Sequence, residues 1–586
     1  MAEKGLTLPS GMLSTKHINC LTFMVVLGTP LIAQKPSSPP KFINPMDLPL
    51  TLSGNFMEPR NDHFHSGLDM RTDGHEGVPV KAVADGWISR VKISPWGYGK
   101  AVYIDHPDGH TSVYGHLQVL KGPVGEACLD AQYKTKDQSI DITPEKGAIP
   151  VKQGEVIALS GNTGGSGGPH LHFELRRTSD QHALDPEALG IEVSDKTPPE
   201  IIGVRLFALT DTSRTTPYPG KAKGFAAQGS AGRYALKPEN IPAAYGTIGL
   251  AVHTIDRYDG SGAKFGPRMI ELFVDSVPAF TTHFDDLDFS VNRYCNAHMD
   301  YALVKEQKME YHRCYRQPNN KLRIYGDEPM QGRIVTRPGR DHHIRLRVTD
   351  ANGNTAELSF LLHGATLKEA LAWPADAQGG SLCRYDTENV LVEEGLRFTL
   401  PPNALYDDVY IRYERKAAPA QALAPLHVIH SPLTPIQSYC DLIITVPDLP
   451  ANQRSKALIV KVDEAGKMSG IGGRYADGKV TAQVRAFGSY SVMLDSVPPV
   501  IQNVDLRTAM TGRSSFSVKV GDNLSGVETW RGTMNGEWVL MEYEPKTKML
   551  THTFDKHTST AGKKDFRLEV GDERGNKANY SLTFTR

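Results

Sequence analysis

Residues 160–175 read SGNTGGSGGPHLHFEL, a glycine-rich loop that runs into a strand-like segment with two histidines at its centre. Side chains alternate between the two faces of a strand, so His170, His172 and Glu174 would share one face and the apolar residues between them the other. Glycines in the loop permit turns and let a ligand approach the bare backbone. The stretch therefore predicts a metal site beside a substrate groove. A half-exposed strand with two incidental histidines is the alternative.

The composition is that of an ordinary globular protein, and the length suggests several domains. The chain has 586 residues, of which 39% are hydrophobic and 22% charged, and its net charge is −1. This balance offers no strong positive field, so nucleic acid is not an expected partner. Many short β-branched and aromatic runs between turns predict a mainly β fold.

An apolar run near the start predicts export. Residues 20–33 are apolar, follow Lys16 and are too short to span a bilayer, which is typical of a signal peptide over residues 1–33. Translation would start at Met1 or Met12, and a proline-rich linker, residues 34–51, would follow. A buried helix and a lipid anchor at Cys20 are the alternatives. No later segment is long and apolar enough to cross a membrane, so no integral span is expected after signal removal.

Five cysteines lie beyond this run. An exported protein can form disulfides, and Cys295 with Cys314 and Cys383 with Cys440 are the two pairs we predict, with Cys128 left single. Free buried thiols are equally compatible with the spacing. No cysteine has the CxxC spacing of a zinc-thiolate or redox site.

A second pair of metal-ligand residue types occurs in residues 61–73, NDHFHSGLDMRTD. Three residues separate His65 from Asp69, and the nearby glycines favour a loop that leads into a strand over a helix. An imidazole nitrogen and a carboxylate oxygen suit Zn²⁺, and one further histidine would leave the fourth position open for water. His63 is an alternative to His65, and a solvated loop is the alternative for the fragment taken alone.

A third histidine ends a predicted hairpin. Residues 100–106 and 110–116 flank a Pro-Asp-Gly turn, and the second arm ends in YGHL, which contains His116. The remaining histidines of this region are expected to be structural or solvated: His75, His106 and His110.

His65-x-x-x-Asp69, the YGHL around His116 and the GPHLHFE around His170 and His172 occur in the order and spacing of the lysostaphin/LytM-type zinc metallopeptidases, the M23 family. The resemblance spans about residues 52–177. It implies that His65, Asp69 and His172 bind one Zn²⁺ and that His116 and His170 are catalytic. It also implies an antiparallel β-sheet peptidase domain, placed here at residues 52–194, and peptide bonds of peptidoglycan as substrate.

The expected chemistry is hydrolysis by metal-activated water. Zinc would polarise the scissile carbonyl and acidify its water, and His116 or His170 would take the water proton or stabilise the oxyanion. The sequence leaves open which histidine plays which part. There is no HExxH motif, and Glu174 is expected to support a ligand or to be structural. Residues 121–149 are longer than the usual connector, and a surface insertion is preferred over a segment that borders the cleft.

The rest of the chain contains a repeat. DKTPPEI at 195–201 matches DSVPPVI at 495–501, RLRVTDANGN at 345–354 matches RLEVGDERGN at 567–576, and the stretch at Asp259 is aligned with that at Asp522. These repeats predict two immunoglobulin-like β-sandwiches, residues 195–366 and 495–586, the first with an insertion around residues 276–330. Calcium binding by their Asp and Asn residues is an alternative to simple turn chemistry. Residues 380–494 weakly resemble a ZU5-like sandwich, which gives about three β-sandwich domains in all.

The leading functional hypothesis is an exported zinc endopeptidase that cuts peptidoglycan in the periplasm or cell envelope, with an extracellular location as the alternative. The alternatives are a non-hydrolytic LytM-like regulator or wall-binding scaffold that activates another hydrolase, and an adhesin-like surface protein with an auxiliary peptidase. The C-terminal β domains would position the peptidase against the wall, an envelope partner or a second copy, unless they are simple spacers.

Overall fold

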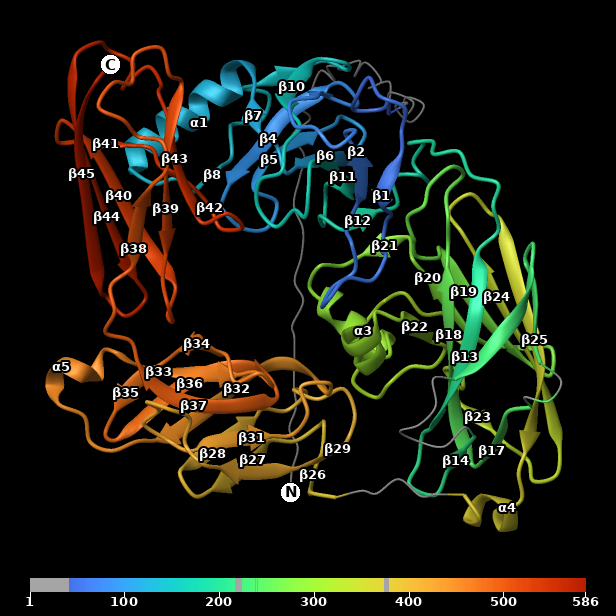
Figure 1. The fold of residues 1–586 in the computed structure, drawn as a ribbon. Coiled ribbons are helices and arrows are strands. Elements are labelled where there is room, and N and C mark those ends of the chain that lie inside the picture. Colours follow the sequence, from blue (N-terminus) through green and yellow to red (C-terminus); the bar gives the residue numbers. More distant parts are fainter. Residues whose placement is uncertain (1–41, 217–223, 238, 240, 374–378) are drawn as a thin grey trace, which may run out of the picture. The chain divides into compact units, whose positions relative to one another are not determined.

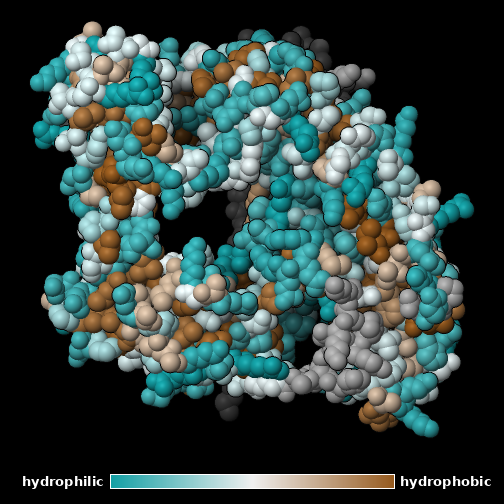
Figure 2. Space-filling model, in the orientation of Figure 1, coloured by the Kyte–Doolittle hydropathy of each residue, from teal (hydrophilic) through white to brown (hydrophobic). Residues whose placement is uncertain are grey.

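The computed structural model describes residues 42–216, 224–237, 239, 241–373 and 379–586 (Figure 1). Strands predominate and helices are few and short, so the mainly β prediction is confirmed. The predicted signal peptide, residues 1–33, and the first part of the predicted linker lie outside the described residues. Among the helices of the described ranges, none combines the length and apolar character needed to span a bilayer. Hydrophilic residues cover most of the face seen in Figure 2.

The first domain is built on an antiparallel sheet whose main path has the order β1-β2-β11-β6-β5-β4-β8. These strands are β1 (Leu52–Gly54), β2 (Leu68–Arg71), β11 (His170–Arg177), β6 (His110–Gly115), β5 (Lys100–Asp105), β4 (Gly86–Ile93) and β8 (Ile140–Ile142). Short strands β9 (Pro150–Val151) and β12 (Ala183–Leu184) pair with β4 and β11, respectively. A smaller sheet contains β3 (Pro79–Lys81), β10 (Val156–Leu159) and β7 (Val119–Leu120). The predicted hairpin is confirmed, because β5 pairs with β6 across the Pro-Asp-Gly turn.

Strand β11 brings the chemistry-bearing residues together through its register. His172 lies opposite Asp69 of β2 on one side and Gly115 of β6 on the other. The intervening apolar side chains, including Leu171 and Phe173, are fully buried in the core, as the alternation predicts. One face of β11 therefore anchors the sheet while the other presents its histidines.

The segment from 121 to 149 contains a helix, α1 (Gly122–Thr135), followed by edge strand β8. Tyr133 of this segment donates a hydrogen bond to Asp555, and the side chain of Gln138 bonds the backbone of Tyr543. The insertion therefore contacts the last β domain.

The second domain is a large sheet whose main path has the order β20-β19-β24-β25-β16-β15-β13-β18-β22. Its long strands are β13 (Glu200–Ala208), β15 (Phe225–Ser230), β16 (Arg233–Leu236), β18 (Thr247–Ile255), β19 (Met269–Val274), β20 (Val277–His283), β24 (Asp341–Thr349) and β25 (Thr355–Gly364). Short elements complete it: β14 (Arg214–Thr215), β17 (Ala243–Tyr245), β22 (Tyr311–Arg313) and β23 (Ile334–Val335), followed by helix α4 (Leu367–Leu371).

The insertion in this domain begins later than predicted. Residues 277–283 form β20, which pairs with β19, so the sheet continues past the predicted start at Ser276 and the irregular part follows His283. That part contains β21 (Asp286–Leu287), a 3-10 turn (Asn292–Tyr294), α2 (Cys295–His298) and α3 (Tyr301–Gln307). Strand β21 pairs with β12, so the insertion extends the sheet of the first domain.

The third domain has two five-stranded sheets around its own core. One contains β27 (Asn389–Glu393), β28 (Leu396–Leu400), β32 (Pro435–Thr445), β36 (Lys479–Ala486) and β35 (Arg474–Ala476). The other contains β30 (Tyr413–Lys416), β31 (Leu426–Ile429), β37 (Gly488–Leu494), β33 (Ala457–Val462) and β34 (Met468–Gly472). The domain also contains a two-stranded sheet and a short helix. The sheet pairs β26 (Ser381–Cys383) with β29 (Val409–Ile411), and the helix is α5 (Ala451–Arg454).

The last domain has two four-stranded sheets around a separate core. One contains β38 (Val500–Asn503), β39 (Ser515–Gly521), β43 (Met549–Thr553) and β42 (Glu542–Glu544). The other contains β41 (Glu537–Val539), β40 (Val527–Met534), β44 (Lys563–Asp572) and β45 (Lys577–Thr585). The D-x-x-G-N stretches of both repeats form the predicted hairpin turns, between β24 and β25 and between β44 and β45.

The two predicted disulfides are wrong. Cys128, Cys295, Cys314, Cys383 and Cys440 are all free thiols in buried positions. Burial raises the pKa of Cys314 and of Cys440 to about 12, so these thiols stay protonated. They pack as small apolar side chains, which is the alternative that the spacing left open.

Candidate metal centre

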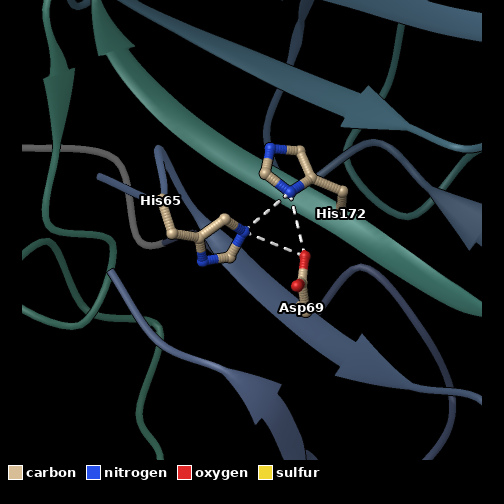
Figure 3. Close-up of side chains that lie close together, drawn as sticks. All are labelled: His65, Asp69 and His172. Carbon is tan, nitrogen blue, oxygen red and sulfur yellow. Dashed lines mark hydrogen bonds and ion pairs between the residues drawn. The ribbon is translucent and has the colours of Figure 1, made fainter. Parts of the chain in front are cut away.

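Three side chains from different parts of the first domain meet at one point (Figure 3). His65 lies in the loop before β2, Asp69 on β2 and His172 on β11. His65 Nε2 is 3.0 Å from Asp69 Oδ1 and 3.0 Å from His172 Nδ1, and His172 Nδ1 is 3.0 Å from Asp69 Oδ1. All three side chains are buried. The structure therefore brings together the three residues that the sequence predicts as ligands.

In His65 and His172, the ring nitrogen that points away from the cluster has its own hydrogen-bond acceptor. His65 Nδ1 lies 2.8 Å from the carbonyl oxygen of Asn55, and His172 Nε2 lies 2.8 Å from Glu174 Oε1. Protons assigned to these outer nitrogens leave the inner nitrogens as lone pairs that face the Asp69 carboxylate. Three electron-pair donors around one point, with no proton between them, fit a metal cation. Two imidazoles and a carboxylate are a donor set that suits Zn²⁺.

Glu174 is the centre of a buried polar network that holds His172. Its Oε1 also accepts hydrogen bonds from Ser66 Oγ and Tyr98 Oη, both at 2.6 Å, and its Oε2 accepts one from Arg176 Nε at 2.6 Å. Burial opposes ionisation of Glu174, but the Arg176 guanidinium and His172 outweigh it and hold the pKa of Glu174 below its ordinary value. An ionised Glu174 fixes the ring of His172, the supporting role expected from the sequence.

The charges around the three residues favour a cation. Burial lowers the pKa of His65. For His172 burial acts in the same direction, but hydrogen bonds to Asp69 and Glu174 outweigh it and raise its pKa to about 9. The carboxylates that favour a proton on His172 would equally favour a metal ion at this point.

The two predicted catalytic histidines lie beside this cluster. The ring centroids of His116 and His170 are 4.8 Å apart, and His170 Nε2 is 3.3 Å from Asp69 Oδ1. His116 Nδ1 bonds the carbonyl of Thr163 at 2.7 Å and His170 Nδ1 that of Gly168 at 2.8 Å, which leaves both Nε2 atoms as acceptors.

His116 is held in an unusual state. Its φ is 59°, a left-handed conformation that costs free energy in a residue with a side chain and that clusters at functional sites. Burial, together with neighbouring His172 and His170, lowers the pKa of His116 to about 3. The imidazole is therefore neutral near neutral pH, and its Nε2 lone pair is free as a hydrogen-bond acceptor.

A cleft of about 930 Å³ opens onto these residues. Bare glycine backbone at Gly165 and Gly167 forms part of its wall. Further lining comes from much later in the chain: Phe289, Asn292, Arg293, Lys308, Glu310 and Arg485. Among the described residues that line the cleft, none belongs to 121–149, which supports the preferred interpretation of that segment as a surface insertion.

The insertion of the second domain also holds the loop that carries His65. Asn292 Oδ1 accepts a hydrogen bond from the backbone N–H of Phe64 at 2.6 Å, and its Nδ2 donates to the Phe64 carbonyl at 3.1 Å. The side chain of Asn55, whose carbonyl bonds His65, makes a similar pair of bonds with the backbone of Gly266. Sequence reasoning missed these supports, because no local signal connects residues more than two hundred positions apart.

The other histidines of the region lie outside the cluster. His63 reaches the cleft but pairs with Asp62 at 3.0 Å and is exposed, so His65 is the histidine beside Asp69. His106 bonds the Asp85 carbonyl and Ser112 in structural contacts.

Comparison with known proteins assigns the two recognisable regions. The model of peptidase family M23 matches residues 63–127 and 140–186, and the Zu5-like domain model matches residues 380–495. The chain thus contains an N-terminal M23 peptidase domain of the lysostaphin-like kind, followed by β domains that include a Zu5-like one.

The curated relatives named below match about a fifth of this chain. The DD-carboxypeptidase/endopeptidase Mpg of Neisseria meningitidis is 36% identical over 113 residues, 19% of this chain and 20% of that protein. The murein hydrolase activator EnvC of Escherichia coli is 35% identical over 114 residues, 19% of this chain and 20% of that protein. Lysostaphin of Staphylococcus simulans is 31% identical over 129 residues, 22% of this chain and 21% of that protein. The match spans about a fifth of the length of each relative.

Among solved structures, the catalytic domain of lysostaphin from Staphylococcus simulans is 27% identical, with a TM-score of 0.18. The alignment covers 24% of this chain and 90% of that domain.

Proposed function

We propose that this protein is a zinc-dependent endopeptidase that hydrolyses peptide bonds of peptidoglycan. The observation that carries the proposal is the geometry of the cleft. Donor atoms of His65, Asp69 and His172 lie 3.0 Å from one another, and acceptor nitrogens of His116 and His170 lie beside them. Membership of the domain in the M23 family supports the same chemistry.

The residues of the cleft would have three roles in this reaction. His65, Asp69 and His172 would hold one Zn²⁺, which supplies Lewis acidity and an acidified water when bound. Nε2 of His116 or of His170 would accept the water proton, and the other imidazole would face the developing oxyanion. Glu174 keeps the His172 ring oriented.

The cleft walls suit a slim peptide that carries carboxylates. Glycine backbone at Gly165 and Gly167 leaves room for D-amino acids or for a glycine bridge, since no side chain projects there. Lys308 and Arg485 offer positive charge to free carboxylates of a stem peptide, whereas Arg293 is paired with Asp62 at 2.8 Å. Because peptidoglycan lies outside the cytoplasmic membrane, we propose export to the periplasm or cell envelope, as the apolar N-terminal run predicts.

The second candidate function is activation of another wall hydrolase, and the similarity to EnvC favours it. The complete set of ligand and acceptor residues favours hydrolysis, because a purely regulatory cleft has no need of them. In either case the C-terminal β domains would position the first domain, against the wall or an envelope partner.

Digestion of purified peptidoglycan by the zinc-loaded full chain distinguishes the two functions. We expect released peptides whose masses locate one cleaved peptide bond, and no release by His116→Asn that still contains zinc. Asparagine is a suitable replacement because it tolerates the left-handed backbone of this position. Release that occurs only when a separate amidase is added would reject the endopeptidase and favour the activator.

A further inference from the structure

A second cluster of metal-ligand residue types lies in the second domain, apart from the cleft. One carboxylate oxygen from each of Asp195, Asp256 and Asp350 lies within 4.8 Å of the other two. The three residues are 7%, 1% and 1% exposed. Asp195 precedes β13 in the connection from the first domain, and Asp256 and Asp350 follow the ends of β18 and β24.

Several oxygens of this cluster have no partner. Both carboxylate oxygens of Asp256 and Oδ2 of Asp195 are buried without a hydrogen-bond donor. Within the described part of the chain, none of the three carboxylates forms an ion pair with Lys, Arg or His. Buried carboxylates are normally paired, hydrogen-bonded or bound to metal, because an uncompensated buried charge is costly. Burial and the Asp350 carboxylate raise the pKa of Asp256 to about 8, which reflects the missing countercharge.

Hydrogen bonds within the D-x-x-G-N turn fix the orientation of the Asp350 carboxylate. Its Oδ1 accepts hydrogen bonds from the backbone N–H groups of Asn352 and Asn354, at 2.9 and 2.8 Å. The side chain of Asn354 bonds both Asp350 Oδ2, at 2.9 Å, and the carbonyl of Asp195, at 3.3 Å. The D-x-x-G-N turn therefore fixes one carboxylate beside the incoming connection.

We propose that Asp195, Asp256 and Asp350 bind one Ca²⁺ that ties the connection before β13 to the ends of β18 and β24. The donor set contains only oxygen, which suits a hard cation and not zinc or copper. Ca²⁺ accepts six to eight oxygen ligands in a flexible geometry, whereas Mg²⁺ demands a near-ideal octahedron and holds several waters that a buried cluster leaves little room for.

The last domain contains a corresponding cluster of three carboxylates, whose hydrogen-bond partners differ. Asp495, Asp522 and Asp572 again lie within 4.8 Å of one another. Here Asp495 Oδ2 accepts a hydrogen bond from Ser525 N, and Asp522 Oδ2 accepts bonds from the backbone N–H groups of Leu524 and Gly526. Asp522 Oδ1 is the one oxygen of these three carboxylates that is buried without a donor, against three such oxygens in the second domain, and we therefore assign the ion to the second domain.

The structure also corrects the alignment of the repeats. The sequence paired Asp259 with Asp522, but it is Asp256 that follows β18 as Asp522 follows β39. Asp259 is exposed and accepts a hydrogen bond from Thr197 Oγ1 at 2.7 Å.

Calcium titration of the zinc-loaded full chain, in buffer freed of calcium by a chelating resin, tests the proposal. We expect calorimetry to detect one tightly bound Ca²⁺ and the melting temperature to rise by a few degrees at saturation. Asp256→Asn should lose both responses, whereas the matched variant Asp522→Asn should keep them. Because Asp256→Asn replaces a buried acid that has no countercharge with a neutral side chain of similar size, it should melt no lower than the wild type without calcium. Misfolding then cannot explain a missing response to calcium.

Three results would overturn the proposal. They are a wild type that neither binds calcium nor shifts its melting temperature, an Asp256→Asn variant that responds like the wild type, and an equal shift with Mg²⁺ alone.

Discussion

The molecule contains two buried clusters of metal-ligand residue types, and they differ in donor chemistry and in access. In the cleft, His65, Asp69 and His172 offer nitrogen and oxygen, and an outer hydrogen bond fixes each imidazole. In the second domain, Asp195 and Asp256 offer oxygen alone, and part of it has no partner. The first cluster opens onto a groove lined with acceptor imidazoles, which suits catalysis, and the second lies at a domain connection, which suits a structural ion.

Removal of a cleft ligand should have the largest effect and should separate the two clusters. We expect His65→Ala to lose its zinc and to lower peptidoglycan hydrolysis by about a thousand-fold or more, because metal activation supplies several kcal/mol of the barrier reduction. Elemental analysis and peptide release measure the two losses. His75→Ala, an exposed histidine nearby, is the control. A metal-free His65→Ala that still cut the wall would remove His65 from the ligand set.

Loss of an acceptor imidazole should reduce the rate without removing the metal. We expect His116→Asn to lower the hydrolysis rate by about 10²–10⁴-fold, the usual contribution of general acid–base catalysis, with zinc content unchanged. Rate and zinc content measured on the same preparation check this. A full rate in His116→Asn would assign the proton transfer to His170 alone.

A smaller effect should follow when the second domain no longer holds the loop that carries His65. Asn292→Ala removes two hydrogen bonds that hold the backbone of Phe64 beside His65, each worth about 1 kcal/mol. We therefore expect zinc affinity to fall by about ten-fold in a competition assay with a chromogenic chelator. Ser290→Ala, on the exposed part of the same segment, should match the wild type. Equal affinity of both variants would mean that the second domain does not position the metal ligands.

A separate prediction concerns stability and two buried histidines that lie outside both clusters. His312 and His298 lie 3.0 Å apart in the second domain, and burial lowers the pKa of His312 to about 3. The unfolded chain takes up this proton below about pH 6.5 and the folded chain does not, so the stability contribution is present above pH 6.5 and is lost as the pH falls toward 3. At pH 5 the loss is about 2 kcal/mol for this histidine. Urea unfolding of the wild type and of His312→Phe should show a steeper pH dependence in the wild type, and parallel curves would contradict it.

Local sequence patterns predict the five cleft residues His65, Asp69, His116, His170 and His172, because these residues lie on or next to adjacent strands. The alternation in HLHFE and the hairpin before His116 fix which side chains share a face. The outer wall could not be predicted in this way. Asn292 and Arg485 reach the cleft through tertiary contacts that leave no periodicity or motif in the chain.

The sequence-based errors also have physical causes. Predicted export and the position of each pair within one predicted domain suggested disulfides between Cys295 and Cys314 and between Cys383 and Cys440, but all four thiols are free and buried. Motif similarity favoured Asp259 over Asp256 as the counterpart of Asp522, although the strand end decides which carboxylate joins the cluster. Pairing and register depend on three-dimensional packing, which short motifs do not encode.

X-ray absorption at the zinc edge of the purified full chain would show whether His65, Asp69 and His172 bind one zinc ion. We expect one zinc per chain, with two imidazole nitrogens at about 2.0–2.1 Å and carboxylate and water oxygens completing four-coordination, and loss of one imidazole in His172→Ala. Sulfur ligands, or a zinc spectrum unchanged in His172→Ala, would contradict it.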